Sequence, residues 1–427
     1  MAFAKDQWTR PVKRPDGSVE RVRNEKRWGR GKRWLAVWLD PRGDERSKAC
    51  ATKTEAVRYG AAMETDRDRG DYLDPHSGKI RLDELGPRWL KSRSVDPSTY
   101  LIYETKWRLH VAPAFGDRQV KSIRPSEIAV WLTELGGRLS PATARLAYLV
   151  LYGCLELAVA DERIKRNPAK SSIVKPPSDS RPNIVAWSDE TVGTIIREHP
   201  DEFQLIPLIG AACGLRQGEI FGLSPDDFDF EEGTIKVRRQ LKRIGKEYVF
   251  SLPKSDQERF VPMPPLVAQK VNEHFERFSV LSCTLPWERV DGEPITVSLL
   301  FQWRDGRHIR ARTYDTAIWR PALAVADVIS KPVMDGRSRM RYKGGNRRTG
   351  MHALRHYYAS VTLADGVNVK ELAEYLGHHD AGFTLRLYAH LLPTSHARAR
   401  SVIEQRLAKL SLLPTEQPRS KDDQTAA

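Results

Sequence analysis

Six side chains in the second half of the chain are of types that together could act on a phosphate ester. They are Arg216, Lys254, His352, Arg355, His378 and Tyr388. The last four lie within one stretch, MHALRHYYASVTLADGVNVKELAEYLGHHDAGFTLRLY. A phenol is a nucleophile, guanidinium groups match phosphate oxygens, and Lys and His side chains transfer protons. These residue types therefore suit phosphoryl transfer on DNA without a metal ion or a cofactor.

In this hypothesis Tyr388 attacks a phosphodiester and forms a phosphotyrosyl bond. Arg216 and Arg355 hold the non-bridging oxygens, because a guanidinium group binds phosphate through parallel hydrogen bonds. They also stabilise the charge of the pentacoordinate transition state, where losing one such donor costs roughly 10²–10³ in rate. The bond energy is kept in the phosphotyrosine, so the reaction needs no ATP.

The remaining side chains supply protons and a hydrogen bond. Lys254 donates a proton to the departing 5′ oxygen, and His352 accepts the proton of the attacking tyrosine. His378 hydrogen-bonds the phosphate. Lys242 and Lys246 lie in the same predicted sheet region as Lys254, so they remain alternatives as the proton donor.

Some of these residues also have a structural explanation when they are taken alone. Arg216 follows a predicted buried helix, so it either pairs with Glu219, three residues later, or binds an anion. A single tyrosine in a helix, such as Tyr388, is most often a core residue. The hypothesis therefore depends on the whole set of residues rather than on any one of them.

His352 and His356 have the i,i+4 spacing of zinc ligands on a helix. A metalloprotease has Glu directly after the first His, and Ala353 stands at that position here. A zinc hydrolase is therefore the weakest of the alternatives. We expect His356 to pack against its neighbours or to support its helix.

Composition points to a soluble protein that meets a polyanion. The 427 residues carry a formal net charge of +15, with 40% hydrophobic and 29% charged residues. Nucleic acid is the first candidate partner for so basic a protein. No apolar stretch reaches the ~18 residues of a membrane span, and the N-terminus lacks the apolar core of a secretory signal. The four cysteines form no CxxC pair, which fits a reduced cytosol, so we expect a cytoplasmic, nucleoid-associated protein.

Residues 1–75 predict a small α+β module fronted by a basic arm. The first 35 residues carry eleven Lys or Arg against four acidic residues. Residues 34–39 have strand composition, and residues 48–51 could pair back with them. An amphipathic helix follows, with Thr54 as the expected N-cap and Gly70 as its end. We expect this module to contact DNA, with phosphates bound by Arg and Lys.

The rest of the chain predicts mostly helical units. Residues 80–170 read as an all-α domain, whose predicted helices are 80–92, 97–110, 125–135 and 140–160. Residues 171–186, rich in Pro, Ser and Lys, read as an interdomain linker. Residues 187–400 predict a mostly α domain with a small antiparallel sheet between positions 233 and 262 and helices including 313–328 and 383–391. Residues 401–427 predict the end of a last amphipathic helix and a disordered tail.

Several stretches, in their order along the chain, resemble those of the tyrosine recombinase family, and specifically of phage-type integrases. They are AACGLRQGEIFGL, PKSDQERFVPMP, HALRHYYAS and LGHHDAGFTLRLYAH, while LAVADERIKRNPA resembles the end of the family's core-binding domain. The resemblance covers roughly residues 80–400. Carried over by position, it implies the same six catalytic residues that the chemistry indicates.

This resemblance implies a multidomain fold with an arm-binding N-terminal module, a SAM-like core-binding domain and the family's catalytic domain. It implies a recombinase that integrates or excises a mobile element through a 3′-phosphotyrosyl intermediate. The implied partners are double-stranded DNA at attachment sites, a homo-tetramer that exchanges C-terminal helices, a DNA-bending host factor and an excisionase, with no membrane. A type IB topoisomerase and a catalytically idle DNA-binding regulator remain the main alternatives.

Overall fold

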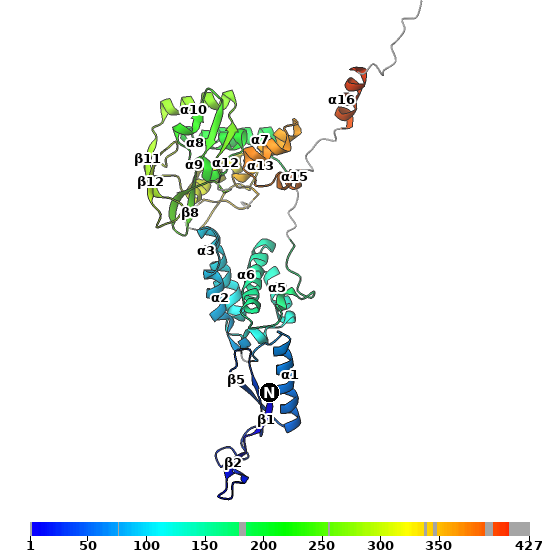
Figure 1. Cartoon of the computed structure of the whole chain (residues 1–427). Helices are drawn as coiled ribbons and strands as arrows, with labels where there is room; N and C mark the ends of the chain where they lie inside the picture. Colours follow the sequence, from blue (N-terminus) through cyan, green and yellow to red (C-terminus); the bar gives the residue numbers. More distant parts are fainter. Residues whose placement is uncertain are drawn as a thin grey trace, which may run out of the picture. The chain divides into compact units, whose positions relative to one another are not determined.

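The computed structural model describes most of the chain, with short gaps. The described residues are 2–75, 77–178, 185–254, 257–336, 340–344, 348–388 and 396–409. The chain divides into two compact units, Met1–Ser180 and Arg181–Ala427, each of which has its own cores (Figure 1). The expected tail beyond residue 409 and part of the expected linker, residues 179–184, lie outside the described residues.

The first unit opens with a three-stranded antiparallel sheet in the order β1-β4-β5. Its strands are β1 (Phe3–Asp6), β4 (Trp34–Leu39) and β5 (Glu45–Cys50), and α1 (Lys53–Asp68) packs on them. Thr52, not Thr54, caps α1, because its hydroxyl accepts a 3.1 Å hydrogen bond from the backbone N–H of Glu55. The pairing of β4 with β5 is as expected, whereas β1 was not predicted.

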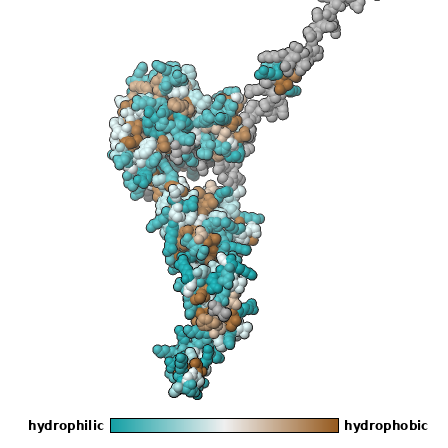
Figure 2. All heavy atoms as spheres, in the orientation of Figure 1, coloured by the Kyte–Doolittle hydropathy of each residue, from teal (hydrophilic) through white to brown (hydrophobic). Residues whose placement is uncertain are grey.

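A second, unpredicted hairpin lies between β1 and β4 in the sequence. Its strands are β2 (Thr9–Lys13) and β3 (Val19–Arg23), paired antiparallel. At its base the rings of Trp8 and Trp28 lie 5.8 Å apart, and the guanidinium of Arg23 lies 4.4 Å from the Trp28 ring centroid. The face of the hairpin that Figure 2 shows is mostly hydrophilic. The basic arm that the composition indicated is therefore largely an ordered ribbon.

A helical domain follows in the same unit. Its main helices are α2 (Leu82–Lys91), α3 (Pro97–Lys106), α5 (Pro125–Gly136) and α6 (Pro141–Ala160). The helix expected at 97–110 changes to π-type turns at Trp107–Val111, and the short α4 (Ala112–Phe115) continues it. The Ser140 hydroxyl caps α6 by accepting a 3.3 Å hydrogen bond from the N–H of Thr143, as predicted.

The length and composition of α6 would also suit a membrane span, although no such span was expected from the sequence. Its buried residues instead build the core of the helical domain. They include Tyr148, Leu151 and Leu155, which lie together with Leu85 of α2 and Leu132 of α5 in one hydrophobic cluster. We therefore interpret α6 as the central helix of this domain.

The second unit is mainly helical. Its first helices are α7 (Asp189–Arg197), α8 (Asp201–Cys213) and α9 (Gln217–Phe221). Strands β6 (Phe228–Asp229), β7 (Thr234–Val237) and β10 (Arg259–Pro262) form a sheet in the order β10-β7-β6. Strands β8 (Gln240–Ile244) and β9 (Glu247–Ser251) form a separate hairpin. The expected short antiparallel sheet is therefore present as two pieces.

The later elements complete this unit. They are α10 (Pro265–Arg277), β11 (Leu281–Pro286), β12 (Pro294–Leu299), α11 (Ala311–Tyr314), α12 (Arg320–Val325), β13 (Val333–Met334), β14 (Met340–Arg341), α13 (His352–Ala364), α14 (Val369–Leu376), α15 (Ala381–Tyr388) and α16 (His396–Lys409). The helix expected at 313–328 was wrong as one element, because π-type turns at Asp315–Trp319 separate α11 from α12. The β11–β12 hairpin was not predicted. Helices α8 and α13 pack on each other in the core of this unit.

Candidate active site

Arg216 lies at the junction of α8 and α9. Helix α8 ends at Gly214, whose φ of 66° is in the left-handed region, so the chain turns sharply before α9 begins. Glu219 of α9 accepts hydrogen bonds from the backbone N–H and from Nη1 of Arg216, both at 2.8 Å. The pairing that the sequence offered as one alternative is therefore present, and Arg216 is held rather than freely exposed.

Arg355 is almost fully buried on α13, with 1% of its surface exposed. Its Nη1 donates a 2.8 Å hydrogen bond to the carbonyl oxygen of Gly214, and its Nη2 donates to the carbonyl oxygen of Leu376. Burial, and next the charge of Arg216, lower the pKa of Arg355 to about 9. Arg355 therefore remains a cation at neutral pH. Its guanidinium group is held in place by carbonyl groups at the ends of two helices, α8 and α14.

Arg259 of β10 is a further member of the site that the sequence analysis missed. Its Nη1 and Nη2 donate to the two carboxylate oxygens of Glu219 at 3.0 and 2.6 Å, and its Nε donates to the carbonyl of Tyr375 at 2.8 Å. Arg259 shares the inward face of its strand with buried Val261. That alternation was the available signal, since an Arg two residues from a buried apolar residue faces the same way.

Glu219 is the anion shared by this cluster of arginines. Its burial alone would raise the pKa of its carboxyl group, but the charge and hydrogen bonds of Arg259, followed by the charges of Arg216 and Arg355, lower that pKa to about 2. The carboxylate is therefore ionised at every physiological pH. It balances one of the three positive charges and leaves a net charge of two around the site.

His378 follows the end of α14 and joins the arginines. Gly377, with φ of 59°, ends that helix, and its carbonyl accepts a 3.1 Å hydrogen bond from Nη2 of Arg216. Nδ1 of His378 lies 2.7 Å from the hydroxyl oxygen of Thr384. Burial, and next the charges of Arg355 and Arg216, lower the pKa of His378 to about 3. The ring is therefore neutral at pH 7.

Tyr388 is the last residue of α15 and is 1% exposed. Its hydroxyl oxygen lies 2.6 Å from Nδ1 of His356, a contact that the sequence analysis did not foresee. Burial raises the pKa of Tyr388 to about 12, against the opposing charge of Arg355. His352 is exposed at the start of α13, with its ring centroid 4.6 Å from that of His356.

The structure thus gathers five of the six predicted residues into one region. Their links are the shared carbonyls at 214, 376 and 377 and the mutual electrostatic effects of Arg355, His378, His352 and Tyr388. Lys254 lies exposed in the loop after β9, and none of the contacts above involves it. Lys242 lies on β8, and Lys246 lies in the turn between β8 and β9.

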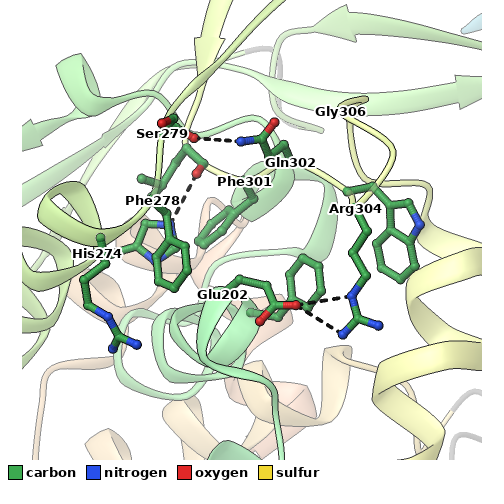
Figure 3. Close-up of a pocket in the computed structure, with 12 residues that line it drawn as sticks. Glu202, His274, Phe278, Ser279, Phe301, Gln302, Arg304 and Gly306 are labelled. Atoms are coloured by element: carbon green, nitrogen blue, oxygen red, sulfur yellow. Dashed lines mark hydrogen bonds and ion pairs between the residues drawn. The ribbon is translucent and has the colours of Figure 1, made fainter.

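A cavity in this unit lies away from the residues described above. A cavity of about 370 Å³ is lined in part by Phe203, His274 and Phe301. Figure 3 shows Arg304 paired with Glu202 at 3.1 Å on one side of it. None of the six predicted residues lines this cavity. Within the described ranges no three His, Cys, Asp or Glu side chains gather as a metal site requires.

Two family models match the chain. The phage integrase family model matches residues 201–395, and the model of the phage integrase N-terminal SAM-like domain matches residues 82–136. The prophage phiRv2 integrase of Mycobacterium tuberculosis H37Rv is 27% identical over 375 residues, covering 84% of this chain and 88% of the relative. The integrase of Mycobacterium phage L5 is 25% identical over 337 residues, covering 78% and 81%.

Solved structures show the same fold. The Tn1549 transposon integrase in complex with transposon right end DNA superposes with a TM-score of 0.62 at 22% identity, covering 77% of this chain and 100% of that chain. A lambda integrase tetramer bound to a Holliday junction gives a TM-score of 0.52 at 15% identity, covering 81% and 94%. The expected multidomain fold, with a SAM-like domain before the catalytic domain, is therefore confirmed.

The segment that the integrase family model matches also contains the candidate catalytic residues. All six, from Arg216 to Tyr388, lie within the segment matched by the integrase family model. The two matched segments together span more than half of the chain. The chain belongs to the phage integrase family of tyrosine recombinases, enzymes that cut and rejoin DNA strands.

Proposed function

We propose that this site-specific recombinase cuts DNA through Tyr388 and forms a 3′-phosphotyrosyl intermediate. The single observation that carries the proposal is the grouping of Tyr388, His378 and Arg355 around the Arg216–Glu219–Arg259 network. Displacement at a phosphodiester passes through a pentacoordinate state with two negative charges. Three guanidinium groups and one carboxylate supply the matching net charge of two.

The hydrogen bonds of the arginines support a role as a phosphate clamp. An arginine has five N–H donors. The contacts described above occupy two donors of the Arg216 side chain and two of Arg355. The remaining donors of each can bind the non-bridging oxygens, and the fixed carbonyl partners keep both groups oriented before DNA arrives. Such preorganised donors cost no rearrangement during the reaction.

The remaining roles belong to the same proposal. His378 donates from Nε2 to the phosphate in this scheme, which its neutral ring and its Nδ1 contact with Thr384 support. His352, exposed at the start of α13, accepts the tyrosyl proton in this scheme. Lys254 protonates the departing 5′ oxygen, with Lys242 and Lys246 as the alternative donors. Its exposed position in a loop fits a group that reaches the site when DNA is bound.

We also propose the assembly that the family resemblance implies. The module of residues 1–75 binds arm-type DNA, residues 80–170 bind the crossover site, and residues 187–400 carry out the chemistry. The solved lambda integrase structure is a tetramer on a Holliday junction, which supports a homo-tetramer. In this proposal α16 is the helix that the subunits exchange. A DNA-bending host factor, an excisionase and a nucleoid-associated location complete this proposal.

The decisive experiment uses nicked duplexes that carry candidate crossover sequence from next to the gene. The nick lets the 5′ fragment leave, so a covalent protein–DNA adduct accumulates on denaturing gels. We expect an adduct through the 3′ phosphate with the wild type and none with Tyr388→Phe, while both proteins bind the DNA equally. An adduct formed by Tyr388→Phe would remove Tyr388 as the nucleophile.

Two further measurements separate the alternatives. Relaxation of a supercoiled plasmid that lacks the crossover site would indicate a topoisomerase, whereas we expect none. A protein lacking residues 1–75 should still bind the crossover site but integrate less efficiently. Equal integration by that shortened protein would show that the module has no part in recombination.

A further inference from the structure

His356 holds the hydroxyl group of Tyr388 across 32 positions of sequence. The Nδ1–Oη distance is 2.6 Å, and the two ring centroids lie 5.8 Å apart. Tyr388 is buried and His356 is partly buried, so water competes weakly for this contact. A hydrogen bond in such surroundings restricts the rotation of the phenol ring about its side-chain bonds.

The protonation states set the direction of this bond. Burial, and next the charge of Arg355, lower the pKa of His356 to about 4, and burial raises the pKa of Tyr388 to about 12. At pH 7 both groups are neutral, so the phenol O–H donates to Nδ1 and the ring proton lies on Nε2. Because the imidazole is so weak a base here, His356 suits holding the hydroxyl far better than removing its proton.

A second hydrogen bond between a histidine and a hydroxyl group, that of His378 with Thr384, also holds α15. Thr384 and Tyr388 lie four residues apart, on one face of α15, and both are buried. Thr384 contacts His378 and Tyr388 contacts His356, at 2.7 and 2.6 Å. His356 also directly follows Arg355, whose guanidinium is tied to Gly214 and Leu376. The position of α15 is therefore coupled to the arginine cluster through α13.

We propose that His356 is a positioning residue for the nucleophile, one that aims the Tyr388 oxygen by a hydrogen bond through Nδ1. This inference rests on the proposed role of Tyr388. It gives a function to a histidine that lies outside the set of six residues and that we expected from the sequence only to pack or to support its helix. His356 does not touch the DNA in this scheme and acts only through Tyr388.

The test compares two substitutions in the full chain. His356→Asn keeps an acceptor, because the amide oxygen of Asn lies near the place of Nδ1. His356→Leu keeps bulk but leaves the buried phenol without an acceptor. We expect His356→Leu to slow single-turnover cleavage of the nicked duplex about tenfold or more, the effect of one unsatisfied buried hydroxyl. We expect His356→Asn to recover most of the rate, and both variants to bind the duplex with wild-type affinity.

The pH profile distinguishes holding from proton removal. A positioning role predicts the same pH dependence of the cleavage rate for the wild type and His356→Asn, because the amide does not titrate near neutral pH. If His356→Asn cleaved as slowly as His356→Leu, or if His356→Leu cleaved at the wild-type rate, the positioning role would be overturned.

A stability measurement tests the bond without reference to activity. We expect the His356→Leu variant to melt at a lower temperature than the wild type. The same substitution should cause a smaller decrease in a Tyr388→Phe background, where the hydroxyl is already missing. Equal losses in both backgrounds would show that the contact contributes nothing. Cleavage that persists in Tyr388→Phe would instead overturn the proposed nucleophile, so the two failures are distinguishable.

Discussion

The carboxylate of Glu219 binds both terminal nitrogens of Arg259, at 3.0 and 2.6 Å, although the two residues are 40 positions apart. The same carboxylate holds Arg216 at 2.8 Å, and none of its surface is exposed. Arg259 is not one of the two arginines proposed to bind the phosphate, although its charge counts toward the net charge of two at the site. Its bond to Glu219 ties β10 to the start of α9 and so fixes the residue that positions Arg216.

Replacing Glu219 with Gln should destabilise the protein strongly. The amide keeps the shape of the side chain but leaves buried guanidinium groups without a counter-charge, which costs roughly 3–5 kcal/mol. The free energy of unfolding from urea titration measures this loss. Glu232→Gln, at an exposed position, is the matched control and should stay within about 0.5 kcal/mol of the wild type. A similar small change for Glu219→Gln would show that the network adds little.

The same carboxylate should make stability depend on acid pH. The pKa of Glu219 falls from 4.5 to about 2 on folding, so its contribution is present above about 4.5 and disappears as the pH falls toward 2. A shift of this size corresponds to about 3 kcal/mol. We expect the difference in unfolding free energy between the wild type and Glu219→Gln to shrink through this range. A difference that stays constant from pH 6 to pH 3 would contradict the assignment.

Local patterns in the sequence predicted the elements that local forces determine. Ser140 and Pro141 announce α6 because a hydroxyl cap and a fixed proline φ favour the first turn of a helix. The types of Tyr388, Arg216 and Arg355 also suggested a chemistry, because few reactions suit a phenol beside two guanidinium groups, and their roles stay a prediction. The position of the Thr52 cap was missed by two residues, since neighbouring threonines in the sequence look equivalent before the chain is folded.

The contacts that complete the site could not be predicted in the same way. Arg259 and His356 meet their partners across 40 and 32 residues, so no local spacing records the pairing. An arginine on a short strand usually faces solvent, and only the buried carboxylate of Glu219 explains why this one turns inward. The sequence therefore indicated which residues we propose to react, and the fold shows which side chains contact them.

Gly214→Ala should damage both stability and the site. Gly214 adopts φ of 66°, where an added Cβ costs about 1–2 kcal/mol. That Cβ would also lie 2.4 Å from Cδ1 of Tyr358, so the helices must shift apart. We expect a loss of roughly 2–4 kcal/mol in thermal or urea unfolding. Cleavage should fall as well, because the Gly214 carbonyl is an acceptor for Arg355.

The control for this substitution is Gly136→Ala at the end of α5. An added Cβ there meets nothing within 4 Å, and the φ of Gly136 is not positive. This variant should be neutral or slightly more stable, because alanine restricts the unfolded chain. If Gly214→Ala were equally harmless, the tight turn between α8 and α9 would not be needed to place Arg355.

A substrate with sulfur at the leaving position can identify the general acid. A thiolate leaves without a proton, since a thiol has a pKa of ~8.5, far below that of an alcohol. We expect Lys254→Met to slow cleavage of ordinary DNA by roughly 10²–10⁴ and to cleave the 5′-bridging sulfur substrate at nearly the wild-type rate. Lys242→Met and Lys246→Met are the matched controls. If the sulfur substrate instead restored the cleavage rate of Lys242→Met or Lys246→Met, that lysine would be the general acid.

Thr384→Val tests whether the hydroxyl of Thr384 fixes the His378 tautomer that can donate to the phosphate. The hydroxyl of Thr384 lies 2.7 Å from Nδ1 of His378, and the low pKa of His378, about 3, keeps the ring neutral at pH 7. When the hydroxyl donates to Nδ1, the ring proton must lie on Nε2, the nitrogen left to donate to the phosphate. Valine has the same shape and no donor. The neutral ring can then also carry its proton on Nδ1, and in that tautomer Nε2 cannot donate to the phosphate.

We therefore expect Thr384→Val to slow single-turnover cleavage by up to about tenfold, the range of one net hydrogen bond. Thr384→Ser, which keeps the hydroxyl, should cleave at nearly the wild-type rate although it loses a buried methyl group. DNA affinity should be unchanged in both variants, because Thr384 contacts His378 and has no part in binding the DNA in this scheme. If the serine variant were the slower of the two, packing around α15 rather than the orientation of His378 would be the function of Thr384.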